Sequence, residues 1–345
     1  MVVGILGHFG NGRKLLNGQT IKTQNLKDGL KKYSDVKVFE IDTYNWKSNP
    51  FSLVKKIIVA LKMCDCIIML PAQNGVKVFA PMIYFLNRRY HKKLFYDVIG
   101  AWLPSFLEKQ KKLQSVLKKF DGIWVETSVL QRKMEKLGFI NINLVPNFKD
   151  IRRNPEVYKS FKKPRSICTF SRVIIEKGIE DIIDAVVKTN NHFGEIVYKL
   201  DIYGQVDKQE QEWFENLLKK IDSVSYVSYL GSVDSEKSVA TLRKYFMLVF
   251  PTKFFTEGIP GTILDAYAAG IPVLASRWES FDDVVVDGKT GYGYEFNDTN
   301  QLYEKLVEIN LNPELIDGLR DNCVNRFSYY ETKNVIEQIV ELMTW

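Results

Sequence analysis

Short apolar runs alternate with segments of helical periodicity along the first half of the chain. The apolar runs, which predict buried strands, lie at residues 2–6, 36–41, 66–70 and 123–126. The segments with helical spacing lie at residues 23–32, 53–63, 81–89 and 104–120. Because strands that alternate with helices usually pair in parallel, this half predicts a parallel sheet with crossover helices.

The same alternation restarts after a segment that lacks periodicity. Residues 146–164 hold three prolines and several basic residues, which is typical of a linker. Beyond it, strands are expected at residues 166–170, 198–203, 224–229, 247–250 and 272–275, and helices at 178–188, 210–221, 239–245, 263–269 and 334–343. The second half therefore predicts a parallel α/β unit of its own.

Together the two halves predict an α/β protein with two Rossmann-like parallel-sheet domains that face a cleft. We expect a first domain at residues 1–150, a linker at 151–164, a second domain at 165–326, and a C-terminal helix within 327–345 that packs back on the first domain. A length of 345 residues agrees with two domains of ordinary size. Ligands of open parallel sheets bind beyond the carboxyl ends of strands, so the site is expected in loops that follow strands.

Composition narrows the class of protein. The chain is 46% hydrophobic and 26% charged, close to globular averages, which excludes collagen-like and disordered classes. The sequence predicts neither a membrane-spanning segment nor a secretory signal. The four cysteines fit neither a zinc nor a disulfide framework, so we expect reduced thiols in a cytoplasmic protein.

Charge is distributed unevenly between the halves. The first 150 residues carry 25 Lys and Arg against 11 Asp and Glu, whereas the remainder carries 23 against 30. The basic half is expected to meet something anionic: a membrane surface, a phosphorylated lipid or nucleic acid. Lysines flank apolar and aromatic positions in the segments 53–63, 88–95 and 104–120. This pattern favours peripheral contact with the inner face of the plasma membrane, and a solvated charged face is the alternative.

The first constellation with candidate chemistry follows the strand expected at 166–170. Its sequence, SRVIIEKG, places Arg172 and Lys177 before a helix that opens at Gly178. A helix N-terminus favours anions, and arginine can grip phosphate oxygens with paired donors. The segment therefore indicates a diphosphate clamp, with two solvated surface cations as the alternative.

The second constellation is EGIPGTILDAYAAGIPVLAS, which begins at Glu257. A glycine-rich turn leads into a short helix that is nearly apolar all round, and such a helix must be buried. Asp265 lies on this helix, where a carboxylate is costly without partners. The two acids are placed to reach different hydroxyl groups of one extended ligand, and the turn N–H groups are placed to meet a phosphate or a sugar. The alternative is a salt-bridged Asp265 inside the core and a solvated Glu257.

The second half of the sequence resembles the family 4 retaining glycosyltransferases of the GT-B fold. The resemblance covers roughly residues 165–325, and rests on FSRVIIEKGIEDIIDAV, LDIYG, YLGSV, the EGIPGTILDAYAAGIPVLAS segment and the glycine turn VDGKTGYG from Val286. The family carries two glutamates separated by seven residues, and here these positions are Glu257 and Asp265. The second acid is thus one methylene shorter than in the family pattern.

The resemblance implies roles for the charged residues. Glu257 matches the acid beside the donor sugar, and Asp265 matches the acid that holds the ribose hydroxyls. Arg172 and Lys177 match the cations that neutralise the diphosphate leaving group, so the catalytic set is Glu257, Arg172 and Lys177. Because these cations supply the positive charge, neither a metal nor a cofactor is implied, and the nucleotide diphosphate sugar is the donor substrate.

The resemblance also implies backbone contacts with the donor. The turn that touches sugar and phosphate matches Gly258, Ile259, Gly261 and Thr262, and the region that reads the base matches Val233. The implied reaction moves a hexose-type sugar with retention of configuration onto a sugar or lipid-linked acceptor. With the basic first half, this suggests synthesis of a surface polysaccharide or glycolipid.

The loop after the first strand is a candidate acceptor or phosphate loop. Many members of the family place a histidine in the region that matches residues 94–100, and this chain has none there. His8 instead follows the first strand, with Gly10 and Gly12 beside it. A glycine-containing loop lets the backbone approach a ligand closely. An ordinary loop histidine is the alternative.

Three other functions fit parts of the pattern. A sugar nucleotide epimerase shares the two-domain architecture and needs no acceptor. A basic nucleic-acid-binding protein fits the charge of the first half, but no recognition motif accompanies that charge. A dinucleotide oxidoreductase is disfavoured because the first loop lacks the G-x-G-x-x-G spacing.

Overall fold

The computed structural model describes residues 1–13, 18–151 and 162–344. The chain forms two compact units: unit 1 holds residues 1–150 together with the segment from Tyr330 onward, and unit 2 holds residues 151–329. Most of the linker expected at 151–164 lies outside the described residues.

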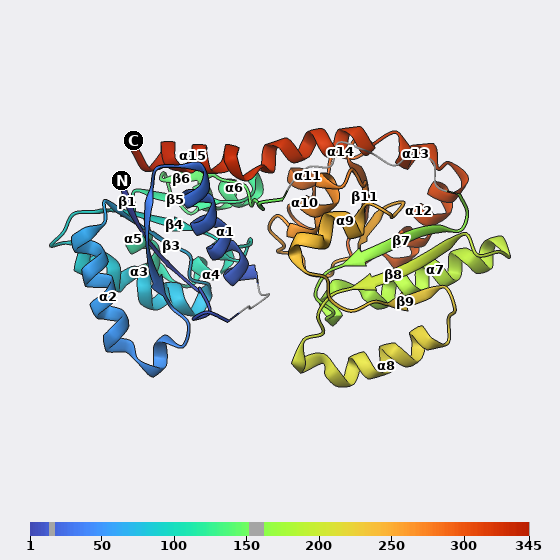
Figure 1. Cartoon of the computed structure of the whole chain (residues 1–345), viewed down its shortest axis with the longest axis horizontal. Coiled ribbons are helices and arrows are strands. Elements are labelled where there is room, and N and C mark those ends of the chain that lie inside the picture. Colours follow the sequence, from blue (N-terminus) through green and yellow to red (C-terminus); the bar gives the residue numbers. More distant parts are fainter. Residues whose placement is uncertain (14–17, 152–161, 345) are drawn as a thin grey trace. The chain divides into compact units, whose positions relative to one another are not determined.

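Unit 1 is built on a parallel sheet, whose order within the described residues is β2-β1-β3-β4-β5-β6. Its strands are β1 (Val2–Gly7), β2 (Lys37–Asp42), β3 (Cys66–Met69), β4 (Lys93–Asp97), β5 (Gly122–Val125) and β6 (Ile142–Leu144). Its helices are α1 (Gly18–Tyr33), η1 (Trp46–Ser48), α2 (Pro50–Met63), α3 (Gln73–Asn87), α4 (Leu103–Glu108), α5 (Lys111–Leu117), α6 (Ser128–Lys136) and α15 (Thr332–Thr344). Figure 1 shows these elements in blue to green, with α15 in red.

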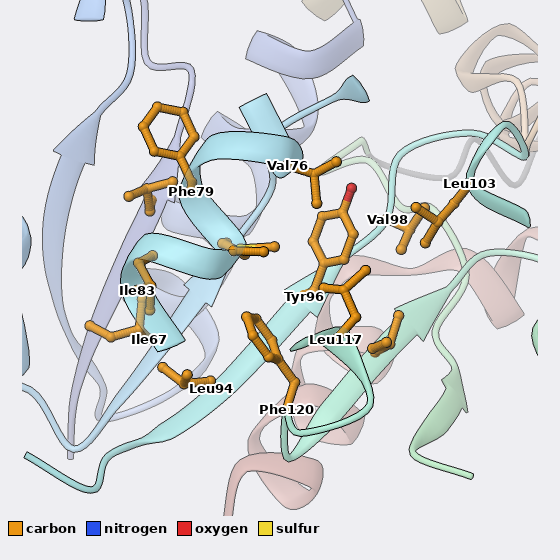
Figure 2. Packing of buried hydrophobic residues seen from close by; sticks show 14 of the residues in the cluster. Ile67, Val76, Phe79, Ile83, Leu94, Tyr96, Val98, Leu103, Leu117 and Phe120 are labelled. Atoms are coloured by element: carbon orange, nitrogen blue, oxygen red, sulfur yellow. The ribbon is translucent and has the colours of Figure 1, made fainter. Parts of the chain in front are cut away.

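Both faces of this sheet are buried. Alternate strand residues point to opposite faces, so Ile67 and Tyr96 join one apolar cluster while Ile68 and Phe95 join another. The first cluster is covered by α2 to α6, and Figure 2 shows Tyr96 among side chains that include Val76 of α3. Burial on both faces explains why these strands are apolar runs in the sequence.

The second cluster is covered by α1 and α15, which pack against each other. The apolar residues of α15 recur every three or four positions, and Val335, Ile336 and Ile339 are all buried. Gly29 of α1 lies against Ile336, where a Cβ atom would meet the isoleucine side chain. The C-terminal helix therefore completes the hydrophobic core of unit 1.

Unit 2 has a second parallel sheet, whose order within the described residues is β12-β11-β10-β7-β8-β9. Its strands are β7 (Arg165–Phe170), β8 (Tyr198–Tyr203), β9 (Val227–Tyr229), β10 (Leu248–Phe250), β11 (Val273–Ser276) and β12 (Gly291–Tyr294). Its helices are η2 (Ile175–Lys177), α7 (Ile179–Phe193), η3 (Lys208–Glu210), α8 (Gln211–Asp222), η4 (Ser235–Lys237), α9 (Ser238–Leu242), α10 (Gly261–Ala268), α11 (Phe281–Val284), α12 (Thr299–Leu311), α13 (Glu314–Asp317) and α14 (Arg320–Phe327), with η5 (Ser328–Tyr330) at the boundary. The α/β architecture predicted from the sequence is confirmed.

Several helices of unit 1 differ from the expectation. The helix α1 begins at Gly18 rather than at residue 23, and α6 is absent from the sequence prediction. The segment 104–120 is not one helix: α4 ends at Glu108 and α5 begins at Lys111. The buried amide of Gln114 donates to the carbonyl of Leu107 at 2.7 Å, which satisfies the end of α4 and stabilises the break. The helix expected at 81–89 begins instead at Gln73, with Pro81 inside it.

Three strands are absent from the sequence prediction, namely β4, β6 and β12. The resemblance implies a glycine turn over VDGKTGYG, but the last residues of this segment begin β12, and only the part around Gly288 is a turn. Gly291 pairs with Val273 of β11, where a Cβ atom would collide with the Val273 carbonyl. This glycine therefore serves close strand pairing.

All four cysteines are buried and free. Burial raises the pKa of the Cys64 thiol to about 11 and that of Cys66 to about 12, which makes both poor nucleophiles at neutral pH. Among the described residues, no helix combines the length and the apolar character that crossing a membrane requires.

Candidate functional site

The loops after β7 and β10 meet at the carboxyl end of the sheet in unit 2. Gly178 lies between η2 and α7 with a φ of 65°, and a Cβ atom there would collide with the carbonyl of Pro251. The N–H of Lys253 donates to the carbonyl of Glu176 at 2.8 Å. Gly178 thus allows the two backbones to approach closely. The loop that carries Arg172 and Lys177 therefore lies against the segment that precedes Glu257.

Lys177 and Glu257 form an ion pair across these two loops, between Nζ and Oε1. Both side chains are largely shielded from water, with exposed fractions of 13% and 15%. Thr252 donates from Oγ1 to the same carboxylate oxygen at 3.1 Å, and the ammonium lies 5.2 Å from the centre of the Phe250 ring. The structure therefore brings together one cation and one acid of the predicted site.

Arg172 is placed differently from Lys177. Its guanidinium is about half exposed and pairs with Asp207 at 3.8 Å. In the part of unit 2 that the structure describes, Arg172 forms no ion pair with Glu257. An exposed pair of this length contributes little stability, so the arginine side chain can turn toward a bound anion at small cost.

The turn that follows Glu257 leads into α10, shown in orange in Figure 1. Gly258 and Ile259 are buried, and Gly261 opens the helix. The hydroxyl of Thr262 is buried and has no hydrogen-bond partner among the described residues. First-turn N–H groups of a helix also have no partner within the helix. This end of α10 therefore offers donors to a ligand.

Asp265 and Val233 lie elsewhere along the carboxyl end of the sheet in unit 2. Asp265 lies one turn into α10 and is only 2% exposed. Val233 is half-buried in the loop after β9. That loop is tied to its neighbour because the N–H of Gly204 donates to the carbonyl of Gly231 at 2.9 Å.

In unit 1, the loop after β1 is held by a residue that the sequence analysis did not single out. The carboxylate of Asp42, at the end of β2, accepts the N–H groups of Phe9 at 2.9 Å and Asn11 at 2.8 Å. Gly10 and Gly12 have φ values of 81° and 79°, which glycine adopts without strain. The loop backbone therefore keeps one conformation at the carboxyl edge of the sheet.

His8 lies at the start of this loop. Its Nδ1 lies 2.7 Å from the hydroxyl of Thr20 in α1, and its ring meets Tyr44 edge-on at 5.4 Å. The imidazole is therefore oriented by neighbours on two sides. Among the residues of unit 1 that the structure describes, no contact identifies a ligand for it.

A buried charged cluster lies at the carboxyl ends of β4 and β5. Lys22 of α1 places Nζ 2.8 Å from both the Asp97 and the Glu126 carboxylates, and donates to the Val98 carbonyl at 3.1 Å. All three charged side chains are at most 5% exposed. The sequence offered one signal, Glu126 at the end of the strand expected at 123–126. Asp97 ends β4, which the sequence did not predict, and the lysine comes from a distant helix.

The electrostatics of this cluster depend on Lys22. Burial raises the pKa of Asp97, and the nearby Glu126 raises it further, while Lys22 opposes both effects. Burial alone would lower the pKa of Lys22, but the two carboxylates outweigh it and raise that pKa. The lysine therefore stays charged and links the ends of two strands.

The described residues contain no group of three or more His, Cys, Asp and Glu side chains placed to hold a metal ion. The proposed site of unit 2 consists instead of the cation Lys177, the acid Glu257 and the N-terminus of α10.

The comparisons place the chain in a family. Residues 150–326, just over half of the chain, match the family model described as glycosyl transferases group 1. The two-unit fold is that of GT-B glycosyltransferases: HepE of Anabaena, in complex with UDP and glucose, matches with a TM-score of 0.75 and 16% identity over 100% of this chain and 99% of that one. The apo lipopolysaccharide outer core galactosyltransferase WaaB matches with a TM-score of 0.70 and 14% identity, over 100% and 99%. The chain belongs to the group 1 glycosyl transferases.

Two curated relatives match over shorter regions. An uncharacterized glycosyltransferase of Methanocaldococcus jannaschii is 30% identical over 147 residues, which are 43% of this chain and 38% of that protein. The alpha-monoglucosyldiacylglycerol synthase of Acholeplasma laidlawii is 28% identical over 155 residues, or 44% and 36%. The matched part of the chain thus corresponds to less than half the length of these relatives.

Removing the Lys22 ammonium should destabilise unit 1 strongly. Lys22→Met removes the ammonium that lies between two buried carboxylates, so we expect the free energy of unfolding to fall by about 3–5 kcal/mol in urea denaturation. The control Lys31→Met removes a lysine of the same helix from an exposed pair with Glu40, and should cost less than about 1 kcal/mol.

The pH dependence of the same variant has a definite sign. Without Lys22, the folded-state pKa of Asp97 stays above its unfolded value, so the folded protein binds more protons than the unfolded chain between the two pKa values. The loss of stability should therefore be smaller at acid than at neutral pH. Equal losses for Lys22→Met and Lys31→Met would contradict the proposed role of the cluster.

Proposed function

We propose that this chain is a retaining glycosyltransferase that transfers a hexose-type sugar from a nucleotide diphosphate sugar to a sugar or lipid-linked acceptor. The observation that carries the proposal is the convergence of Lys177 and Glu257 next to the N-terminus of α10. The HepE complexes with UDP, with glucose and with UDP-glucose support such a donor. The synthase and galactosyltransferase relatives support a role in surface polysaccharide or glycolipid synthesis.

The cations act on the leaving group in this proposal. Departure of a nucleoside diphosphate builds negative charge on the phosphate oxygens, and donors already aimed at that charge lower the barrier. Lys177 is held in place by its partners, while Arg172 is free to turn from Asp207. The first-turn N–H groups of Gly261 and Thr262 add the positive end of a helix dipole. We propose that these groups make a metal ion unnecessary.

The acids and the turn recognise the rest of the donor. Glu257 is assigned to the donor sugar and Asp265 to the ribose hydroxyls. The turn formed by Gly258, Ile259, Gly261 and Thr262 contacts sugar and phosphate, and the backbone at Val233 reads the base. The unpartnered hydroxyl of Thr262 supports this assignment, because a bound phosphate or sugar would satisfy it. Attack by the acceptor on the same face as the departing phosphate retains the anomeric configuration without a protein nucleophile.

Unit 1 is assigned to the acceptor. The loop with His8, Gly10 and Gly12 lies at the carboxyl edge of its sheet, and its conformation is set by Asp42. The family assignment favours transfer over the epimerase and nucleic-acid-binding alternatives.

We also propose that unit 1 contacts an anionic membrane through α3 and α5. These helices pack together, and α5 with the residues after it exposes Lys111, Lys112, Lys118 and Lys119. Phe85 of α3 is 68% exposed, and the ammonium of Lys77 lies over the Phe106 ring at 4.9 Å. Exposed lysines beside exposed aromatic side chains suit the boundary between headgroups and acyl chains.

Loss of either member of the Lys177–Glu257 pair should abolish transfer without unfolding the protein. Lys177→Ala removes charge stabilisation of the leaving group, for which we expect at least a 100-fold lower kcat. Glu257→Ala removes the carboxylate assigned to the donor sugar, and should lower kcat to a similar extent. Transfer is measured as nucleoside diphosphate released in the presence of acceptor, and thermal melting checks the fold.

The matched control for this experiment is Lys253→Ala. Lys253 lies in the same loop but pairs with Asp181 outside the proposed site. Loss of the Lys253 ammonium should leave turnover within about threefold of the wild type, because this lysine is partly exposed and the proposal gives it no contact with the donor. Turnover close to wild type in Lys177→Ala or Glu257→Ala would refute the site assignment.

Charge reversal on α5 should weaken membrane binding. Each basic residue near an anionic surface contributes about 1 kcal/mol, so Lys111→Glu with Lys112→Glu should reduce binding to phosphatidylserine vesicles by at least about tenfold in sedimentation assays. The control, Lys199→Glu with Lys219→Glu, makes the same total charge change on exposed residues of unit 2. Equal binding by the two double variants would contradict the membrane assignment.

A further inference from the structure

A chain of hydrogen bonds runs from the sheet of unit 2 to the Glu257 carboxylate. Ser276, the last residue of β11, donates from its hydroxyl to the carbonyl of Thr252 at 2.6 Å. Thr252 in turn donates from Oγ1 to Oε1 of Glu257 at 3.1 Å. Both hydroxyl residues are only 1% exposed. The acid of the proposed site is thus connected to the end of a central strand through buried groups.

The direction of the Thr252 hydroxyl proton follows from its neighbours. The N–H of Phe254 donates to Oγ1 at 3.2 Å, so the hydroxyl already accepts one hydrogen bond and has a single proton to give. The Glu257 oxygen at 3.1 Å is nearer than the alternative acceptor, the Glu176 carbonyl at 3.5 Å, and it carries a charge. Hydrogen bonds to ionised acceptors are the stronger ones, so the proton points to Glu257.

The two oxygens of Glu257 are therefore in unlike positions. Oε1 receives both the Lys177 ammonium and the Thr252 hydroxyl. Oε2 receives no hydrogen bond or ion pair from any residue that the structure describes, and the side chain retains some exposure. Without Thr252, the carboxylate would be free to rotate and offer both oxygens to Lys177.

We propose that Thr252, held by Ser276, is a positioning residue that keeps Oε2 of Glu257 available to a hydroxyl group of the transferred sugar. The inference rests on the proposed function, because it presumes that a sugar nucleotide occupies this site. It assigns Thr252 a role in recognising the sugar part of the donor and none in recognising the nucleoside diphosphate part.

The test compares binding of a sugar nucleotide with binding of its parent diphosphate. Calorimetry measures UDP-glucose, UDP-N-acetylglucosamine and GDP-mannose against UDP and GDP, and the tightest sugar nucleotide is carried forward. Thr252→Val keeps the shape of the side chain but removes the hydroxyl. It should lower the affinity for the sugar nucleotide about tenfold and change the affinity for the diphosphate by less than about twofold. Thr252→Ser keeps the hydroxyl and should bind both ligands like the wild type.

Two further variants guard against trivial effects. Thr189→Val makes the same chemical change in α7, where the hydroxyl donates to the Ala185 carbonyl, and should leave both affinities unchanged. If Thr252→Val fails to fold, Ser276→Ala decides the question, because it loosens Thr252 without altering its hydroxyl. Ser276→Ala should also lower the affinity for the sugar nucleotide and not that for the diphosphate, and the loss should be smaller than in Thr252→Val.

Several results would overturn the inference. Unchanged sugar nucleotide binding in Thr252→Val would do so, and so would equal losses for sugar nucleotide and diphosphate, or a loss in Thr252→Ser as large as in Thr252→Val. Glu257→Ala separates this failure from failure of the proposed function. If Glu257→Ala abolishes transfer while Thr252→Val binds normally, only the positioning role falls. If Glu257→Ala remains active, or no sugar nucleotide binds, the proposed site itself is wrong and the inference falls with it.

Discussion

The ion pair between Lys177 and Glu257 is the interaction on which the proposed site depends. Removing two charges from water is costly, and the cost is offset only when geometry and further hydrogen bonds are good. Unit 2 provides these through Thr252, which shares the carboxylate with the lysine, and through Gly178, which allows the two loops to approach. A pair maintained in this way suits a site that must later offer its cation to phosphate and its acid to a sugar.

Unit 1 follows the same physical logic at the edge of its own sheet. Lys22 joins two buried carboxylates, and Asp42 fixes the loop that carries His8. In both units, the central strands are apolar and buried, and polar groups from several elements meet at the strand ends. There Lys22 pairs with Asp97 and Glu126, and Lys177 pairs with Glu257, so each cation meets acids from different elements.

Much of this arrangement could be predicted from the sequence. The alternation of apolar runs and helical segments predicted two parallel α/β units, and the motifs around Lys177 and Glu257 located two residues that lie in contact. Strands β4, β6 and β12 were missed because the first begins with a lysine, the second has three residues, and the third contains alternate glycines. Lys22, Thr252 and Ser276 carry no local signal, since their partners come from distant elements. The pairing of Arg172 with Asp207 likewise depends on the fold.

The most direct test of the central claim is a crystal structure of the protein with a bound nucleotide sugar. We expect the diphosphate beside Lys177 and the first turn of α10, with the sugar against Glu257. A donor bound elsewhere, with Lys177 and Glu257 still paired and untouched by the ligand, would contradict the claim that these two residues share one substrate.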